Sequence, residues 1–313
     1  MRLLVAFLFV NLSLTTFAQS FKTSKPDSIR FNIQDVSNFW SAYDQLPKAA
    51  SHADSLQIIT NEYLNKASRG LELYREMSGS NAESFLEVIR KHPKLLQSIR
   101  ANTLAISTQQ EPLLKGVRKL KNIYPSSVFP ELFFCVGKFE VAGNRTADIL
   151  YIGTELTCLS KDSPRDEITN PYIKKSAGNF DDLDVVCLHE IVHYQQKLVA
   201  KTNIEQALVE GGAEFIAHHL TRKSTMQALF DQMNPALEKE IWSEFTPQAN
   251  KPIDANWFLA LGDEQKKRPG MLGYLIGFRI CERYYKKAKD KQAALRNIIT
   301  LSEPQAILEG TGY

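Results

Sequence analysis

Apolar residues recur every three or four positions over residues 35–124, which is the spacing that brings them to one face of an α-helix. The spacing is clear at Phe39, Tyr43 and Leu46. We therefore expect residues 19–124 to form a helical N-terminal region whose amphipathic helices serve packing. The polar residues 19–30 at its start are expected to be a flexible lead-in.

The pattern of hydrophobic positions changes after this region, where aromatic and β-branched residues become frequent. Two strands are predicted over residues 132–141 and 148–153, with a turn over residues 143–146 between them. Residues 160–180 are polar and predict a long surface loop, after which the helical spacing returns. Together these segments predict a mostly helical α+β fold with a small β-sheet.

The composition is that of an ordinary globular protein, because 43% of the 313 residues are hydrophobic and 23% are charged. This excludes a largely disordered or collagen-like chain. The formal net charge is only +3, and the basic residues form no long run. We therefore expect no nucleic-acid partner.

The first eighteen residues have the features of a secretory signal peptide. Arg2 precedes the short apolar run Leu3–Val10, and Ala18 provides a small residue at the cleavage site. A membrane anchor is the alternative, but polar residues interrupt the run well short of the roughly 20 apolar residues that a spanning helix needs. Gln19 stands where a lipid anchor requires a cysteine. We expect an exported protein, periplasmic or extracellular, that is cleaved after Ala18 and has no transmembrane anchor.

Four cysteines are present, which does not indicate a disulfide framework in a chain of this length. Cys135 and Cys158 lie on stretches that could pair as strands, so one bridge between them is conceivable. Four free thiols with apolar neighbours are the equal alternative.

The segment CLHEIVHYQQ, residues 187–196, contains the pattern H-E-x-x-H. On a helix, His189 and His193 lie one turn apart on the same face, so that both imidazoles can bind one metal ion. Glu190 points to the edge of that face, where it can take a proton from a metal-bound water. The pattern therefore predicts the zinc site of a hydrolase.

The neighbouring residues favour a helix at this motif. Asp181 or Asp182 can cap a helix that begins near Leu183. An apolar stripe along this helix leaves both histidines on the adjacent face, and it comprises Val185, Leu188, Val192 and Val199. The alternative is a buried helix whose two histidines are only structural.

A zinc ion needs a third protein ligand, and the next helix offers two carboxylates. Thr202 and Glu205 form a capping box, so this helix is expected to begin near Ile204. Glu210 and Glu214 are four residues apart in its segment VEGGAEF and share a face. The two glycines between them each cost roughly 1 kcal/mol in a helix interior, which predicts the close approach of another backbone.

The helical rise assigns a role to each carboxylate. With a turn at residues 200–202, His193 and Glu210 lie roughly 10 and 12 Å of helix from the turn, and His189 and Glu214 roughly 16 and 18 Å. In an antiparallel pair of helices, Glu210 is then level with His193, and Glu214 with His189. We predict Glu210 as the third zinc ligand and Glu214 as the residue that orients His189. An exposed helix carboxylate is the alternative for Glu214.

Several segments resemble known proteins. HEIVH followed by VEGGAEF resembles the gluzincin peptidases, whose third zinc ligand is a glutamate in the helix after H-E-x-x-H. The chain as a whole resembles the predicted zinc-dependent proteases of unknown function that are related to the GldB gliding-motility lipoproteins. The matching segments are SIRANT (98–103), YPSSVFP (124–130), FFCVGKF (133–139), HEIVHYQQ (189–196), VEGGAEF (209–215) and GYLIGFRI (273–280). Those lipoproteins carry a lipid-attachment cysteine that this chain lacks.

The resemblance also implies a residue that stabilises the oxyanion of the tetrahedral intermediate, because gluzincin-like enzymes use a tyrosine or histidine from a later helix for this. Tyr274 follows the turn at Pro269 and Gly270 and could have this role. A packing tyrosine is the alternative. His218 is left outside the metal site, and whether it or Tyr274 meets the oxyanion stays open.

These observations predict an exported zinc metallopeptidase with a zincin-like (gluzincin) catalytic region over residues 125–313. His189, His193 and Glu210 would hold one Zn²⁺ ion, and Glu190 would be the general base for hydrolysis of a peptide or protein substrate. The edge strand of the sheet could hold that substrate in extended form. The alternative is a non-catalytic cell-envelope interaction protein that keeps a structural zinc site and binds an envelope partner. Structural sites usually have four protein ligands, so three ligands favour the enzyme.

Overall fold

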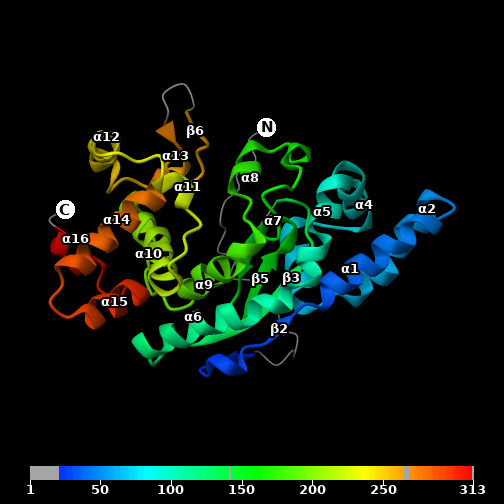
Figure 1. Ribbon diagram of the computed structural model, residues 1–313, viewed down its shortest axis with the longest axis horizontal. Coiled ribbons are helices and arrows are strands. Elements are labelled where there is room, and N and C mark those ends of the chain that lie inside the picture. Colours follow the sequence, from blue (N-terminus) through cyan, green and yellow to red (C-terminus); the bar gives the residue numbers. More distant parts are fainter. Residues whose placement is uncertain (1–20, 141, 264–267, 312–313) are drawn as a thin grey trace.

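The computed structural model describes residues 21–140, 142–263 and 268–311. The N-terminal helices lie at one end of the molecule, the sheet lies in the middle, and the C-terminal helices lie at the other end (Figure 1). The helices of the N-terminal half are α1 (Gln34–Gln45), α2 (His52–Glu62), α3 (Arg69–Ser78), α4 (Ala82–Lys91), α5 (Pro93–Leu104) and α6 (Gln110–Ile123). The helical region predicted from the apolar spacing is confirmed.

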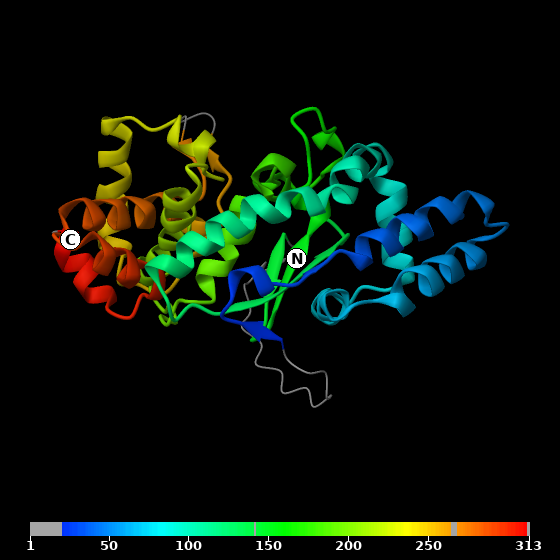
Figure 2. The same cartoon turned by 60° about the horizontal axis from the view of Figure 1, so that its bottom comes forward.

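One sheet crosses the middle of the molecule (Figure 2). Its strands are β1 (Lys22–Thr23), β2 (Phe31–Asn32), β3 (Phe129–Cys135), β4 (Gly143–Arg145) and β5 (Ile149–Gly153). The order is β1-β3-β5-β4, and β2 also pairs with β3. The strands β3 and β5 are parallel, whereas β4 is antiparallel to β5 and lies at the edge. The mostly helical α+β fold with a small mixed sheet is therefore confirmed.

Two expectations about the sheet are wrong. The first strand ends at Cys135, and residues 143–145 form the edge strand β4 where a turn was expected. A tight turn cannot join two parallel strands, so the chain must return between them, and the returning segment itself pairs with β5.

The flexible lead-in is also wrong. Lys22–Thr23 and Phe31–Asn32 both pair with β3, and Ile29 between them is buried. Strands of two residues are too short to show a pattern of alternating hydrophobic positions, so the sequence gives no sign of them. They form because β3 provides the backbone with which they pair.

The two faces of the sheet are covered by different helices. Tyr151 of β5 stacks on Tyr74 of α3, and Phe133 of β3 lies against Gly70 of the same helix. Side chains alternate along a strand, so Leu150 and its neighbour across the edge, Arg145, lie on the opposite face. Helix α9 covers that face, because Arg145 contacts it.

The C-terminal half is a layer of helices. They are α9 (Leu183–His193), α10 (Asn203–Thr221), α11 (Gln227–Phe230), α12 (Pro235–Phe245), α13 (Ala255–Phe258), α14 (Leu272–Lys287), α15 (Lys291–Thr300) and α16 (Pro304–Thr311). Before them come α7 (Thr154–Thr157) and α8 (Pro171–Ser176), and a two-stranded ribbon joins β6 (Gly262–Asp263) to β7 (Arg268–Pro269). Buried residues of both halves form one continuous hydrophobic core.

The segment 160–180 is not simply a surface loop. It contains α8, and Ile168 and Ile173 are buried. A helix of six residues is too short for its apolar spacing to be recognised in a polar stretch.

The helices α10 and α14 cross at unusually short range, as the glycines of α10 predicted. A Cβ on Gly211 would lie 2.5 Å from the Cα of Gly277 on α14 and closer still to the nitrogen of Phe278. A Cβ on Gly212 would meet only ordinary contacts, the nearest being the Sγ of Cys281 at 3.6 Å. The close backbone approach is therefore confirmed, and it depends on Gly211 and Gly277. This crossing fixes the position of α14 on the helix that carries both carboxylates.

All four cysteines are buried free thiols, so the open question of a bridge between Cys135 and Cys158 is decided against it. Within the described ranges, no helix is long and apolar enough to cross a membrane. The signal peptide expected over residues 1–18 lies outside the described residues.

Candidate metal centre

Helices α9 and α10 bring the residues of the two motifs together. Helix α9 begins at Leu183 as predicted, but a 3₁₀ turn precedes it and the side chain of Asp182 makes no capping hydrogen bond. Helix α10 begins at Asn203, and the predicted capping box of Thr202 and Glu205 is confirmed.

The connection between the two helices is longer than the predicted turn at residues 200–202. Helix α9 ends at His193, and Val199, expected on its apolar stripe, is 67% exposed. Tertiary contacts end the helix, because the backbone N–H of Lys197 donates to Thr300 and the side chain of Gln195 bonds to Val128. The predicted facing pairs nevertheless occur.

Three nitrogen and oxygen atoms form a small triangle at the centre of the site. The Nε2 atoms of His189 and His193 are 3.1 Å apart, and each lies 3.5 Å from Oε2 of Glu210. Ligands of a tetrahedral zinc ion are about 3.3–3.4 Å apart when each metal–ligand bond is about 2.0–2.1 Å. The donor set and its spacing therefore fit one zinc ion.

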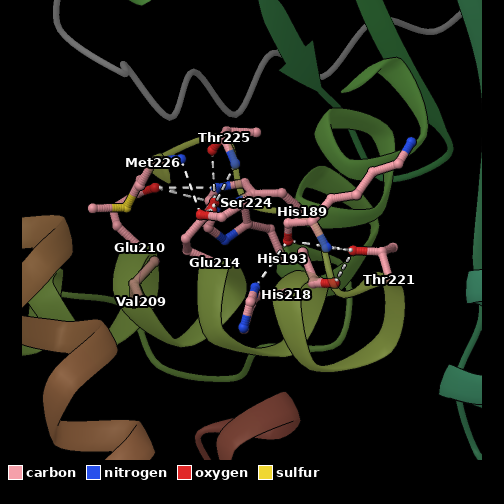
Figure 3. A network of polar contacts seen from close by, with 12 residues as sticks. His189, His193, Val209, Glu210, Glu214, His218, Thr221, Ser224, Thr225 and Met226 are labelled. Atoms are coloured by element: carbon pink, nitrogen blue, oxygen red, sulfur yellow. Dashed lines mark hydrogen bonds and ion pairs between the residues drawn. The ribbon is translucent and has the colours of Figure 1, made fainter. Parts of the chain in front are cut away.

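Glu214 determines which nitrogen of His189 faces the triangle. Its Oε2 lies 3.2 Å from Nδ1 of His189, so this ring nitrogen donates the hydrogen bond and Nε2 faces the triangle. A ring that is neutral, as a metal ligand must be, then has its lone pair on Nε2. Ser224 and Thr225 donate three hydrogen bonds to the same carboxylate, at 2.7, 2.8 and 3.0 Å (Figure 3). The carboxylate of Glu214 is thus held in place and orients His189, as its predicted position opposite that residue implied.

Gln196 has the corresponding role for His193 and was missed in the sequence. Its Nε2 donates to the carbonyl of Val209 at 2.8 Å, so its Oε1 must accept the 2.7 Å hydrogen bond from Nδ1 of His193. Both histidines therefore turn Nε2 toward Glu210. The signal that could have indicated it is its place three residues after His193, on the same side of the turn.

The site concentrates negative charge in the interior. Glu210 is 7% exposed and Glu214 only 1%. Burial opposes protonation of His189, but hydrogen bonds to the two carboxylates outweigh it and raise the pKa of this imidazole to about 10. Burial would raise the pKa of Glu210, yet the two imidazoles hold it well below its usual range. Buried carboxylates need a cation beside them, which either a protonated His189 or a metal ion that replaces its proton would supply.

Tyr274 lies beside Glu210, whereas His218 does not reach the centre. Burial, and then the charge and hydrogen bond of Glu210, raise the pKa of Tyr274 well above its ordinary value, so the phenol stays a donor. Gln206 donates a second hydrogen bond to Glu210 at 3.0 Å. The ring of His218 bonds to the carbonyl of Lys223 instead.

Glu190 lies at the accessible side of the triangle. It groups with the two histidines, with one possible ligand atom of each residue within 4.8 Å of the others. Its side chain is 17% exposed, and its Oε2 is 3.7 Å from Nη1 of Arg145 on β4. Arg145 was missed because its segment was interpreted as a turn.

A scan of protein families matches residues 19–313 to the family described as gliding motility protein GldB. The chain belongs to this family. The chain matches none of the curated proteins and none of the solved structures. The resemblance to the gliding-motility family is confirmed, whereas the resemblance to zinc-dependent proteases and a gluzincin core stay predictions.

The residues of the candidate metal centre all lie within the part that matches the GldB family. Helix α9 supplies His189, Glu190 and His193, and α10 supplies Glu210 and Glu214. The family match does not say which function these residues have in this GldB-family chain.

Replacing Gln196 by alanine is expected to weaken zinc binding about 10- to 100-fold, because His193 loses the partner that fixes its tautomer. The dissociation constant is measured by competition with a chromophoric chelator. Gln195→Ala is the matched control, since among the described residues the buried side-chain amide of Gln195 bonds only to Val128 and Ile191. We expect this control to lower stability by about 1–3 kcal/mol and to leave zinc affinity unchanged. Equal zinc affinity in the two variants would contradict the role of Gln196.

Proposed function

We propose that this GldB-family protein is an exported zinc metallopeptidase that acts in the cell envelope. The observation that carries the proposal is the orientation of both imidazoles. Glu214 and Gln196 each hold a protonated Nδ1, so both Nε2 atoms meet the buried carboxylate of Glu210 at the spacing of metal ligands. A structural pair of histidines has no need for two separate orienting partners and a third ligand.

His189, His193 and Glu210 would hold the zinc ion. When bound, zinc supplies a Lewis acid that polarises a carbonyl and makes water more acidic. Three protein ligands would leave room for water or substrate beside the ion, as in catalytic rather than structural zinc sites.

The residues around the ligands have separate tasks. The carboxylate of Glu190 accepts a proton from water and later gives it to the leaving amine. The phenol of Tyr274, which stays protonated, donates a hydrogen bond to the negative oxygen that develops on the substrate carbonyl. Until substrate arrives, that phenol donates to Glu210.

The edge strand β4 offers a place for the substrate. Among the described residues it pairs only with β5, so its outer edge can accept an extended peptide as an additional strand. Gly143 of β4 lies beside Glu190, since a Cβ on this glycine would be 3.7 Å from the carboxyl group. A peptide on β4 would therefore run past the general base.

The test of this proposal is the digestion of a peptide library by the purified protein, with its zinc content measured in parallel. We expect about one zinc per chain and cleavage that a chelator stops and added zinc restores. An intact library at full zinc occupancy would reject the peptidase. That result would favour the alternative, a non-catalytic cell-envelope interaction protein that keeps a structural zinc site. Gliding motility, which the family description names, would be its context.

A further inference from the structure

Residues 222–225, which we call the return segment, bring the chain back from the end of α10 to the carboxylate of Glu214. Ser224 and Thr225 of this segment donate three hydrogen bonds to Glu214, which in turn meets Nδ1 of His189 (Figure 3). The position of the return segment therefore determines where the partner of His189 lies.

The backbone of Lys223 joins the return segment to the last turn of α10. Its N–H donates to Oγ1 of Thr221 at 3.1 Å, and its carbonyl accepts a hydrogen bond of 3.1 Å from Nδ1 of His218. Arg222 just before it has a φ of 66°, a left-handed conformation that is costly for a residue other than glycine. The contacts of Lys223 hold the chain in this turn, and they give His218 a role outside the metal site.

The side chain of Lys223 joins the same segment to α9. Its Nζ donates to Oδ1 of Asp184 at 2.9 Å and to the carbonyl of Asp181 at 2.7 Å. Asp184 stands in the first turn of α9, and its side chain is only 6% exposed, so it offers the ammonium group a fixed acceptor. Lys223 thus connects the helix that carries both histidines with the helix that carries Glu210 and Glu214.

The place of Lys223 in the chain makes this connection matter for the metal centre. It directly precedes Ser224 and Thr225, whose hydroxyl groups lie 2.7 and 2.8 Å from oxygens of Glu214. Hydroxyl hydrogen bonds have lengths of about 2.5–3.0 Å, so a shift of the segment by about 1 Å would break both. Glu214 would then be free to turn away from His189.

We propose that Lys223 is a positioning residue of the metal centre, which ties the return segment to α9 and so holds Ser224 and Thr225 against Glu214. It acts through Glu214 on the orientation of His189 and not on the metal ion itself. This inference rests on the zinc centre of the proposed function.

A double-mutant cycle on zinc affinity tests it. The dissociation constant is measured by competition with a chromophoric chelator for the unaltered chain, Lys223→Met, Glu214→Ala and the chain with both changes. Lys223→Met alone should weaken zinc binding about three- to tenfold, as the coupling between contacting residues leads us to expect. In the Glu214→Ala chain, the same change should weaken binding less than about twofold, because the residue through which Lys223 acts is gone. A lysine that only stabilises the fold would weaken binding by the same factor in both chains.

Lys119→Met is the matched control. Its Nζ donates to the carbonyl of Leu220 at 2.6 Å, so this lysine holds the end of α10 just before the return segment begins. We expect this variant to keep the zinc affinity of the unaltered chain. Lys223→Arg should keep most of that affinity, because its guanidinium can still donate to Asp184.

Thermal melting checks that each variant is folded. The side chain of Lys223 is 42% exposed, so solvent screens its ion pair and the loss of this pair should leave the protein folded. Should Lys223→Met not fold, Asp184→Asn takes its place in the cycle, since it weakens the same ion pair from the other side.

Unchanged zinc affinity in Lys223→Met, or an equal loss in the presence and absence of Glu214, would overturn the inference. Its failure is distinguishable from that of the proposed function. Zinc-dependent cleavage with unchanged affinity in Lys223→Met refutes only the role of Lys223, whereas the expected affinities without any cleavage refute only the peptidase. An unaltered chain that bound no zinc would overturn both.

Discussion

Glu190→Gln should abolish peptide hydrolysis while the protein keeps its fold and its zinc. The amide has nearly the shape of the carboxylate but cannot accept a proton from water, and Glu190 is not one of the three ligands facing the triangle. Loss of a general base typically costs about 10²- to 10⁴-fold in rate. The turnover of a peptide found in the library digest is measured beside the zinc content of the same sample.

Glu240→Gln serves as the control for this change, because it removes an exposed carboxylate of α12 that is remote from the motif. This variant should hydrolyse the peptide at the rate of the unaltered chain. If Glu190→Gln also did so with zinc bound, Glu190 would not be the base and the mechanism would be wrong.

The two carboxylates of α10 should respond differently to removal. Glu210→Ala leaves two imidazoles, which are too few for tight zinc binding at neutral pH, so dialysis against a mild chelator should empty the site. Glu214→Ala removes only the partner that orients His189, and zinc binding should weaken about 10- to 100-fold without being lost. Metal content by elemental analysis after dialysis separates the two outcomes.

Circular dichroism checks that both variants are folded. This check is needed because Glu214 also accepts hydrogen bonds from Ser224 and Thr225, which its removal leaves without this partner. An empty Glu214→Ala beside a zinc-filled Glu210→Ala would show that the two roles are exchanged.

The positions of the candidate ligands were predictable because they depend on local periodicity. Two histidines four residues apart share a helical face wherever the helix lies, and the rise per residue placed Glu210 and Glu214 opposite them. The assumed helix up to residue 199 was wrong, since α9 ends at His193. The predicted facing pairs still occur, because the two helices are antiparallel. The residue nearer the connection on one helix then faces the residue nearer the connection on the other, whatever the shape of the connection.

The surroundings of the ligands were not predictable in the same way. Arg145 meets Glu190 only because β4 returns along the edge of β5, and Ser224 reaches Glu214 only because the chain folds back after α10. These contacts follow from tertiary structure and leave no period in the sequence. The same holds for β1 and β2, whose two residues each pair with a strand about one hundred residues away.

The four buried thiols give the molecule a set of internal probes for its own motions. Cys135 ends β3, Cys158 follows α7, Cys187 lies on α9 and Cys281 on α14, and none is more than 1% exposed. A thiol reagent can reach each of them only when the surrounding structure opens, so the labelling rate at each cysteine reports the free energy of that local opening. Labelling with and without added zinc would thus tell whether a bound metal stabilises only α9, one of the two helices that would hold it, or also the sheet and the helix that carries Tyr274.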